Sequence, residues 1–254
     1  MKSIHVLPVL TLVVVVLLWQ AGVMISGVQP FLVPSPAEVA TEAFAGRELL
    51  GAASGVTVMG ALSGFGLSAF LGTCFAFLLT RARWIEWSLV PYAIFMQTVP
   101  IVALAPLLVL WFGPGFKSVA ASSFLVSVFP VIASATTGLR SVDPEHRNLF
   151  KLYAATPWQR FWKLEAPSAV PYWLAGLRSA SGLAVIGAVV GEFVAGQSGE
   201  SPGLGNVIMG AYRQIQTPRL FAAIFCCSAM GLLMYGAVSW IGQRWLSRWH
   251  ASSG

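Results

Sequence analysis

The residues able to do covalent chemistry in this sequence are few. The stretch GQSG (196–199) imitates the serine motif of membrane proteases. A nucleophilic serine there needs a base within hydrogen-bond reach. The candidate bases are the three histidines, His5, His146 and His250, and the charge distribution described below assigns all of them to the opposite side of a membrane. We therefore predict no catalytic residue and keep an intramembrane hydrolase as an alternative.

The sequence also lacks a clear nucleotide-binding or metal-binding motif. A phosphate-binding loop needs a glycine directly before its lysine, and none of the four lysines has one; the stretch GPGFKS (113–118) has Phe116 at that place. Cys226 and Cys227 are adjacent and point to different sides of a helix, so no metal site is expected. The sequence thus predicts no cofactor in this chain, and any energy from ATP must come from a separate protein.

The composition is that of a membrane protein. Of its 254 residues 57% are hydrophobic and only 9% are charged, and the mean hydropathy is +0.76. Soluble domains carry about 25% charged residues, so this chain could not cover a globular surface with polar groups. We predict an all-α polytopic membrane protein in which residues 1–254 form a single membrane domain.

Six stretches are long and apolar enough to cross the bilayer, which takes about 20 residues. The candidate over 174–195 contains Arg178 and Glu192. The first candidate, over 6–25, imitates a signal peptide but is too long for one and is kept as a helix. Gly60 and Gly64, four residues apart, predict close helix packing. The predicted spans are 6–25, 55–80, 87–112, 118–139, 174–195 and 220–243.

The basic residues predict the orientation of these spans. With the N-terminus inside, eleven of the fifteen lysines and arginines lie on the cytoplasmic side and four outside, which places both termini in the cytoplasm. The outside set is Arg47, Lys117, Arg213 and Arg219. The same distribution accounts for the net charge of +6, so that charge does not indicate a nucleic-acid partner.

Residues 140–173 form the largest predicted cytoplasmic segment, and they carry explicit helix signals. Asp143 is a good N-cap with Pro144 in the first helical position. Thr156 is a second cap, followed by Pro157 and by Gln159 in the capping-box position. We expect two short helices joined by a tight turn near residues 154–156.

The second of these helices is expected to end at Pro167 and to be amphipathic. Trp158, Phe161, Trp162 and Glu165 follow the i, i+3, i+4, i+7 spacing of one helix face. The residues alone leave two interpretations, a helix resting on lipid headgroups or an element that docks into a groove of a cytoplasmic partner. A scaffold that only recruits such a partner remains a further alternative.

The stretch ATPWQRFWKLEAPSAVPYWLAGLR (155–178) resembles the EAA loop of permease subunits in binding-protein-dependent ABC importers. The similarity is to the nitrate, sulfonate, taurine and bicarbonate group, with related permeases for riboflavin and pyrimidine vitamin precursors. Four further stretches resemble segments of these permeases in the same order. They are FLVPSPAEV (31–39), VPIVALAPLLVLWFGPG (99–115), FPVIASATTGLRSVDPE (129–145) and GEFVAGQSGESPGLGNVI (191–208).

The resemblance implies a type I importer permease in the bacterial inner membrane, with cytoplasmic coupling helices. It further implies a cytoplasmic ATPase dimer that binds ATP and Mg²⁺, a second permease copy, an external binding protein, and as substrate a small organic anion, a nitrate- or sulfonate-like compound or a vitamin precursor. The coupling residues it implies are Asn148, Lys151, Ala154, Ala155, Thr156, Pro157, Trp158, Gln159, Phe161 and Trp162.

The chain departs from the family pattern at three places in this loop, one of which is Ala166-Pro167 in place of the usual Leu-Pro. Asn148 begins the triplet where the family has Glu-Ala-Ala, which puts in doubt any salt bridge of that glutamate with the ATPase. Ala154 stands where the family has glycine, and we expect its turn to avoid a positive φ.

Polar groups inside spans are the candidates for lining a translocation pathway, because exposing them to lipid is costly. Glu192 is expected to face the pathway or an interhelical partner, with snorkelling to the outer interface as the alternative. Gln97 and Thr98 form a second candidate pair. Pro100 removes one backbone hydrogen bond and predicts an irregular third span.

Overall fold

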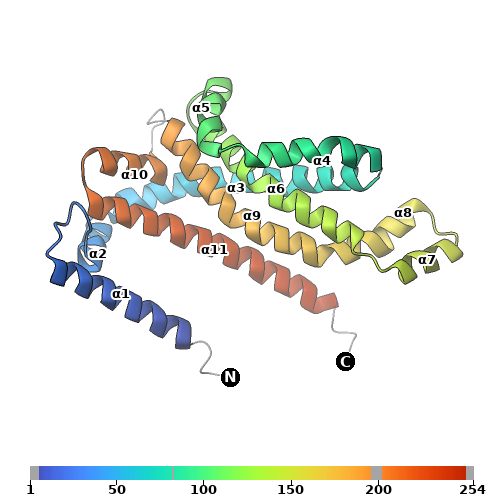
Figure 1. Ribbon diagram of the computed structural model, residues 1–254, viewed down its shortest axis with the longest axis horizontal. Helices are drawn as coiled ribbons and strands as arrows, with labels where there is room; N and C mark the ends of the chain where they lie inside the picture. Colours follow the sequence, from blue (N-terminus) through green and yellow to red (C-terminus); the bar gives the residue numbers. More distant parts are fainter. Residues whose placement is uncertain (1–5, 82, 196–201, 250–254) are drawn as a thin grey trace.

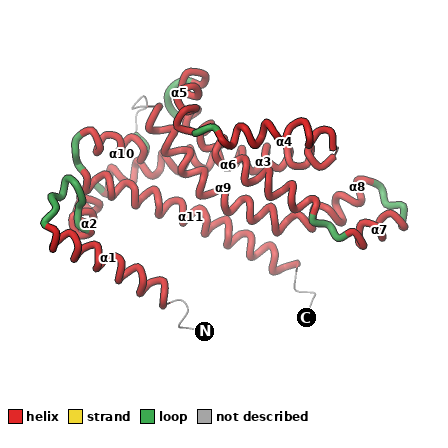
Figure 2. Tube along the Cα trace, in the orientation of Figure 1, coloured by secondary structure: helices red, strands yellow, loops and turns green. Residues whose placement is uncertain are grey.

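The computed structural model describes residues 6–81, 83–195 and 202–249, and within these ranges every regular element is helical (Figures 1 and 2). The α-helices are α1 (Val6–Ser26), α2 (Pro36–Ala45), α3 (Arg47–Arg81), α4 (Arg83–Thr98), α5 (Ile101–Phe112), α6 (Phe116–Arg140), α7 (Pro144–Leu152), α8 (Pro157–Arg160), α9 (Ala166–Ala195), α10 (Leu204–Arg213) and α11 (Thr217–Trp249). A π-helical turn, η1 (Phe161–Glu165), lies between α8 and α9. The all-α fold class is confirmed.

Among the described residues, five helices are long and apolar enough to cross a membrane. The stretch predicted as one span over 87–112 is instead divided into α4 and α5, which meet at an angle of 99°. Pro100 is the cause, because it takes an extended conformation (φ −61°, ψ 124°) and caps α5, and a proline has no N–H to continue the preceding helix. If the bent pair is one span, the molecule has the six that were predicted.

The centre of the molecule is a three-helix packing of α3, α6 and α9, which lie side by side in Figures 1 and 2. Small residues make the approach possible: a Cβ on Gly60 would meet Val119, and one on Gly187 would lie 2.7 Å from the backbone of Ser123. Without water inside a bilayer, helices associate through such close packing rather than through hydrophobic burial. The prediction that the glycines of α3 permit close packing is confirmed.

The sequence predicted that a short helix ends at Pro167 and that the next helix begins after it. The structure shows no such break. Elements α8, η1 and α9 form one continuous helix over Pro157–Ala195, 39 residues long. The π turn explains the difference, because the N–H of Ala166 bonds to the carbonyl of Phe161 five residues earlier. The helix is already in wide π geometry where the proline enters, so the missing N–H of Pro167 does not end it.

Candidate functional site

The segment between α6 and α9 forms a helical elbow, here defined as residues 143–162, that projects at one end of the bundle (Figure 1). Its first helix, α7, begins as predicted. The Asp143 carboxylate accepts the backbone N–H of Glu145 at 2.8 Å, and Pro144 occupies the first turn. The first N–H groups of a helix have no intrahelical partners. The Asp143 carboxylate satisfies one of them, and Pro144 removes another.

The turn between α7 and α8 differs from the prediction at Ala154. This residue has a φ of +48°, although an alanine was expected to avoid the left-handed region. Two hydrogen bonds impose the conformation: the N–H of Ala155 donates to the carbonyl of Phe150 and that of Ala154 to Lys151, each at 3.0 Å. This is the Schellman pattern, which requires a left-handed residue at this position and accepts alanine at a cost.

The second helix of the elbow begins with the predicted capping box. The Thr156 hydroxyl accepts the N–H of Gln159 at 3.3 Å, while the Gln159 side chain accepts the N–H of Thr156 at 2.9 Å. Pro157 stands at the first helical position. The start of α8 is therefore set by local hydrogen bonds and not by tertiary packing.

Aromatic side chains divide the elbow into an anchored and an exposed part. Phe161 turns toward the bundle and packs edge-on against Phe77 of α3, with 4.8 Å between ring centroids, and the guanidinium of Arg81 lies over both rings. Trp158 and Trp162 contact each other but remain 67% and 55% exposed. Helix α3 thus anchors the elbow through Phe161. The exposed side of the elbow, here called its free side, presents the indoles of Trp158 and Trp162.

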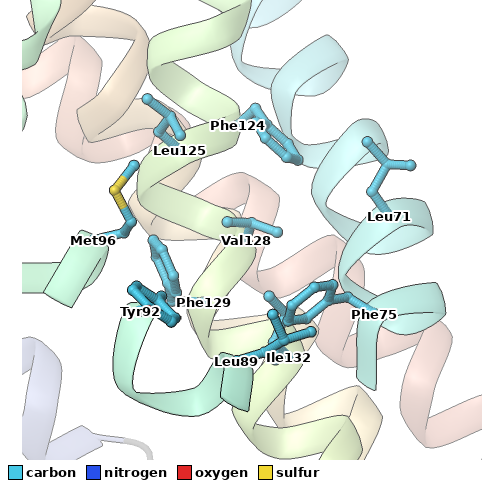
Figure 3. Close-up of a pocket in the computed structure, with 10 residues that line it drawn as sticks. All are labelled: Leu71, Phe75, Leu89, Tyr92, Met96, Phe124, Leu125, Val128, Phe129 and Ile132. Carbon is cyan, nitrogen blue, oxygen red and sulfur yellow. The ribbon is translucent and has the colours of Figure 1, made fainter. Parts of the chain in front are cut away.

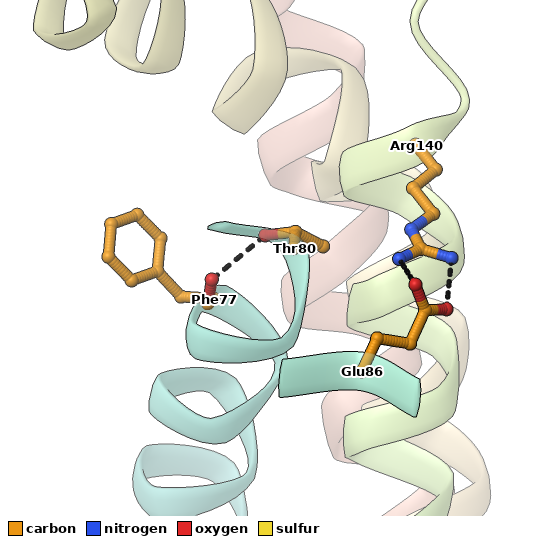
Figure 4. A network of polar contacts seen from close by, with 4 residues as sticks. All are labelled: Phe77, Thr80, Glu86 and Arg140. Carbon is orange, nitrogen blue, oxygen red and sulfur yellow. Dashed lines mark hydrogen bonds and ion pairs between the residues drawn. The ribbon is translucent and has the colours of Figure 1, made fainter. Parts of the chain in front are cut away.

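An ion pair lies at the base of the elbow. Arg140, the last residue of α6, makes two hydrogen bonds to the carboxylate of Glu86 on α4 (Figure 4). A paired guanidinium and carboxylate fix both position and orientation. The ion pair therefore ties α4 to the point where the chain leaves α6 for the elbow, an arrangement with no obvious signal in the sequence.

The structure brings all ten predicted coupling residues into the elbow. Asn148 and Lys151 are exposed on α7, and Gln159 is exposed on α8. Phe161 is the exception in orientation, because it is half-buried against α3. Leu149, Leu152 and Tyr153, which were not among the predicted residues, add exposed apolar surface beside the indoles.

The pathway candidates lie apart from the elbow and from each other. Glu192 is only 2% exposed, so it does not snorkel to the surface. Its carboxylate accepts the N–H of Gly205 at 2.7 Å and lies 3.1 Å from the Thr57 hydroxyl, which in turn accepts the N–H of Leu204 at 2.9 Å. The expectation of an interhelical partner is confirmed, and Thr57 had not been singled out.

Gln97, Thr98 and Pro100 are exposed at the bend between α4 and α5. The Thr98 hydroxyl donates to the carbonyl of Phe95 in its own helix at 2.7 Å. Gln97 lines a cavity of about 230 Å³ together with residues of α4, α5, α6 and α9, among them Leu125 and Leu183. Of the three residues, Gln97 is therefore the one whose side chain lines this cavity.

A second cavity, of about 330 Å³, lies between α3, α4 and α6 (Figure 3). All ten of its lining residues are apolar or aromatic, and Tyr92 alone carries a side-chain polar group. Such a lining has no means of orienting a polar solute. On the α4 side the cavity is lined by Leu89, Tyr92 and Met96.

Of the residues on which the hydrolase alternative depended, the structure describes His146. The stretch 196–199 lies outside the described residues. His146 is exposed on α7 at the elbow, and no group of three or more His, Cys, Asp or Glu residues in the described part of the chain could hold a metal ion.

An all-α polytopic bundle with a capped helical elbow at one end defines a class, that of membrane transport permeases. The chain belongs to the family described as "Binding-protein-dependent transport system inner membrane component", which matches residues 64–247. It is thus an ABC importer permease with several membrane-spanning helices. Family members are transport subunits, and as a class they work with an ATPase and a binding protein.

Named relatives cover almost the whole chain. The riboflavin transport system permease protein RibX of Chloroflexus aurantiacus is 36% identical over 97% of this chain and 90% of its own length. A probable ABC transporter permease protein of Haemophilus influenzae is 34% identical over 94% and 96%. The formylaminopyrimidine transport permease protein ThiX of Halalkalibacterium halodurans is 34% identical over 91% of both.

A solved structure shares the fold. The crystal structure of an amino acid ABC transporter with histidines matches with a TM-score of 0.61 and 15% sequence identity, covering 80% of this chain and 94% of the other. At that identity the match concerns the fold alone. It agrees with the type I importer permease fold that the sequence predicted.

Proposed function

We propose that this chain forms one half of a translocation pathway for a small solute and that the elbow couples it to a cytoplasmic ABC ATPase dimer. The other half is a second, identical copy, and the solute is delivered by an external binding protein. The observation that carries the proposal is the elbow itself, a capped helix pair whose free side presents Leu149, Tyr153, Trp158 and Trp162.

The composition of that free side favours docking into a protein. Tyr153 and Trp158 are 79% and 67% exposed, and large, nearly rigid side chains of this kind are the usual anchors of protein interfaces. The Schellman turn and the capping box order the segment in advance, which reduces the entropy lost on binding. Asn148 offers no carboxylate at the family's glutamate position, so apolar contacts carry more of this interface.

The proposal fixes the orientation of the chain in the membrane. The elbow and both termini lie in the cytoplasm, in agreement with the distribution of the basic residues. ATP and Mg²⁺ are bound by the partner ATPase, whose closed and open states bind the elbow differently. Only such a difference in binding can shift the permease between its own two states.

We propose a heteroaromatic vitamin or vitamin precursor as the transported solute. Relatives named for riboflavin and formylaminopyrimidine transport are 36% and 34% identical to this chain, whereas a putative aliphatic sulfonates permease of Bacillus subtilis is 30% identical. Gln97 supports the proposal because its amide both donates and accepts hydrogen bonds, which suits the ring nitrogens and carbonyls of such compounds. Thr98 and Pro100 shape the bend that holds Gln97 in place.

The coupling role is tested by crosslinking. A Gln159→Cys variant, combined in turn with cysteines along the facing cleft of the ATPase, is expected to form a disulfide-linked product. Gln214→Cys, on an exposed residue just after α10, is the matched control and is expected to form none. Transport of radiolabelled riboflavin or formylaminopyrimidine by the complex in proteoliposomes is then measured with and without ATP.

The outcomes separate the alternatives. Crosslinking together with ATP-dependent solute flux supports the permease function. Crosslinking without flux of any of a panel of solutes, including sulfonates, points to the scaffold, and solute hydrolysis by the purified chain alone points to the hydrolase. A Gln159→Cys variant that never links to the ATPase contradicts the coupling role.

A further inference from the structure

The buried carboxylate of Glu192 joins three helices at the end of the molecule opposite to the elbow. Glu192 comes from α9, Thr57 from α3, and the two amides that they accept, those of Leu204 and Gly205, form the first turn of α10. We call this group of four residues the α10 clamp. Figure 1 shows α8 and α10 at opposite ends of the bundle.

The clamp satisfies groups that would otherwise be costly to bury. The first amides of a helix have no intrahelical acceptors, and inside a membrane no water replaces them. Thr57 and Glu192 are 0% and 2% exposed, so neither reaches solvent. The positive end of the α10 dipole, the N–H of Gly205 and the Thr57 hydroxyl offset the cost of burying the carboxylate, although its Oε1 has no hydrogen-bond partner among the described residues.

The clamp also depends on the absence of side chains in α10. A Cβ on Gly205 would lie 2.7 Å from the Cβ of Glu192 and 2.6 Å from the carbonyl oxygen of Val189. The amide of Asn206 adds a further bond, donating to the backbone carbonyl of Glu192 at 2.8 Å. Helix α10 is therefore held against α9 by both backbone and side-chain contacts.

The clamp and the elbow are at the two ends of one helix. Elements α8, η1 and α9 run without a break from Pro157 to Ala195, and 35 rises of 1.5 Å place Glu192 about 50 Å from Pro157 along that axis. No loop that could absorb a displacement of the elbow end interrupts this helix, although Pro167 and Pro171 each remove one of its backbone hydrogen bonds.

We propose that Glu192 is a positioning residue that transfers movement of the α8–α9 helix to α10, so that α10 moves with the elbow. The inference rests on the proposed function, because the movement originates where the ATPase binds. It assigns Glu192 a hydrogen-bonding role between helices in place of a role as a charge on the pathway. An uncharged acceptor of the same shape should therefore serve nearly as well.

The test measures the distance between α10 and α2, a helix outside the clamp, in the complete complex. Spin labels are attached at Tyr212→Cys on α10 and Phe44→Cys on α2, both exposed, in a variant without the native cysteines. Distance distributions are recorded in lipid nanodiscs with the ATPase, without nucleotide and with Mg-ATP and a hydrolysis-deficient ATPase. The unmodified clamp is expected to give two different distributions.

The clamp variants are expected to differ in a defined order. Glu192→Ala should abolish the ATP-dependent shift and broaden the distribution, whereas Glu192→Gln should retain the shift because its amide oxygen still accepts the N–H of Gly205. Glu48→Ala removes an exposed carboxylate from the first turn of α3 and should leave the shift unchanged. If Glu192→Ala does not assemble, Glu192→Met, which fills the same space without an acceptor for the N–H of Gly205, carries the same expectation.

Two results overturn the inference. One is a full shift in Glu192→Ala or in Glu192→Met, and the other is a loss of the shift in Glu192→Gln equal to that in Glu192→Ala, which would point to the charge. Crosslinking of Gln159→Cys to the ATPase with no shift in the unmodified clamp overturns the inference alone. Absence of that crosslink overturns the coupling role as well.

Discussion

Ala154 holds the elbow turn in a backbone region that glycine normally occupies. Its φ of +48° is imposed by the hydrogen bonds that close α7, and the same bonds direct α8 and η1, which carry the exposed indoles of Trp158 and Trp162. A left-handed conformation costs an L-residue about 1–2 kcal/mol. The elbow therefore contains a small local strain at the point where it changes direction.

Replacing Ala154 with glycine is expected to raise the stability of the protein. The relieved strain is set against the extra freedom of glycine in the unfolded chain, about 0.5–1 kcal/mol, which leaves a net gain of up to about 1.5 kcal/mol. Thermal unfolding of the purified chain in detergent checks this. Ala155→Gly, at a neighbouring position without a positive φ, should lower the unfolding temperature, and a drop in both variants would contradict the argument.

Helices α3 and α6 approach each other through small residues on one face of each. Gly64 of α3 lies directly against Ser123 and Phe124 of α6, so a Cβ there would overlap with both. Gly66, two residues further, has nothing within 4 Å of the same position. The two glycines lie in the same helix but face different directions. Gly64 faces α6 and permits the close contact, whereas Gly66 faces away from any neighbour.

This difference predicts opposite effects of one substitution. Gly64→Ala is expected to destabilise the bundle by about 1–3 kcal/mol, since added atoms in a tight contact force the helices apart. Gly66→Ala is expected to be neutral or to stabilise by up to about 1 kcal/mol, because alanine is the better helix former. Unfolding temperatures and the yield of monodisperse protein measure both, and equal losses in the two variants would contradict the predicted packing.

At the scale of the whole molecule, the continuous Pro157–Ala195 helix connects an elbow at one end with the α10 clamp at the other. The helices beside it leave apolar surfaces on their outer sides, as expected for a chain surrounded by lipid. The ion pair of Glu86 with Arg140 ties α4 to the elbow end. The two ends therefore differ in kind, with an exposed aromatic surface at one and a buried polar junction at the other.

The proposed orientation predicts opposite labelling of these ends. In a variant without native cysteines, Gln159→Cys should react with a membrane-impermeant maleimide only in inverted vesicles. Tyr212→Cys, exposed on α10, should react only in right-side-out spheroplasts. Labelling of Gln159→Cys from outside would reverse the assigned topology and with it the coupling role.

The amino-acid sequence by itself determined the features that depend on local chemistry. Apolar stretches long enough to span a bilayer, the caps at Asp143 and Thr156, and the break at Pro100 each follow from a few neighbouring residues. They could be predicted because the free energy that decides them arises within one or two helical turns. The aromatic face of α8 was visible for the same reason.

Only the tertiary structure decided the features that join distant parts of the chain. Pro167 lies inside a helix because the preceding π turn accommodates it, and Ala154 is left-handed because the hydrogen bonds of its turn outweigh its own preference. Thr57 and Glu192 are 135 residues apart in sequence, and their contact exists because α3, α9 and α10 pack together. Neither residue's neighbours in the sequence specify that packing, so no local pattern could have revealed the junction.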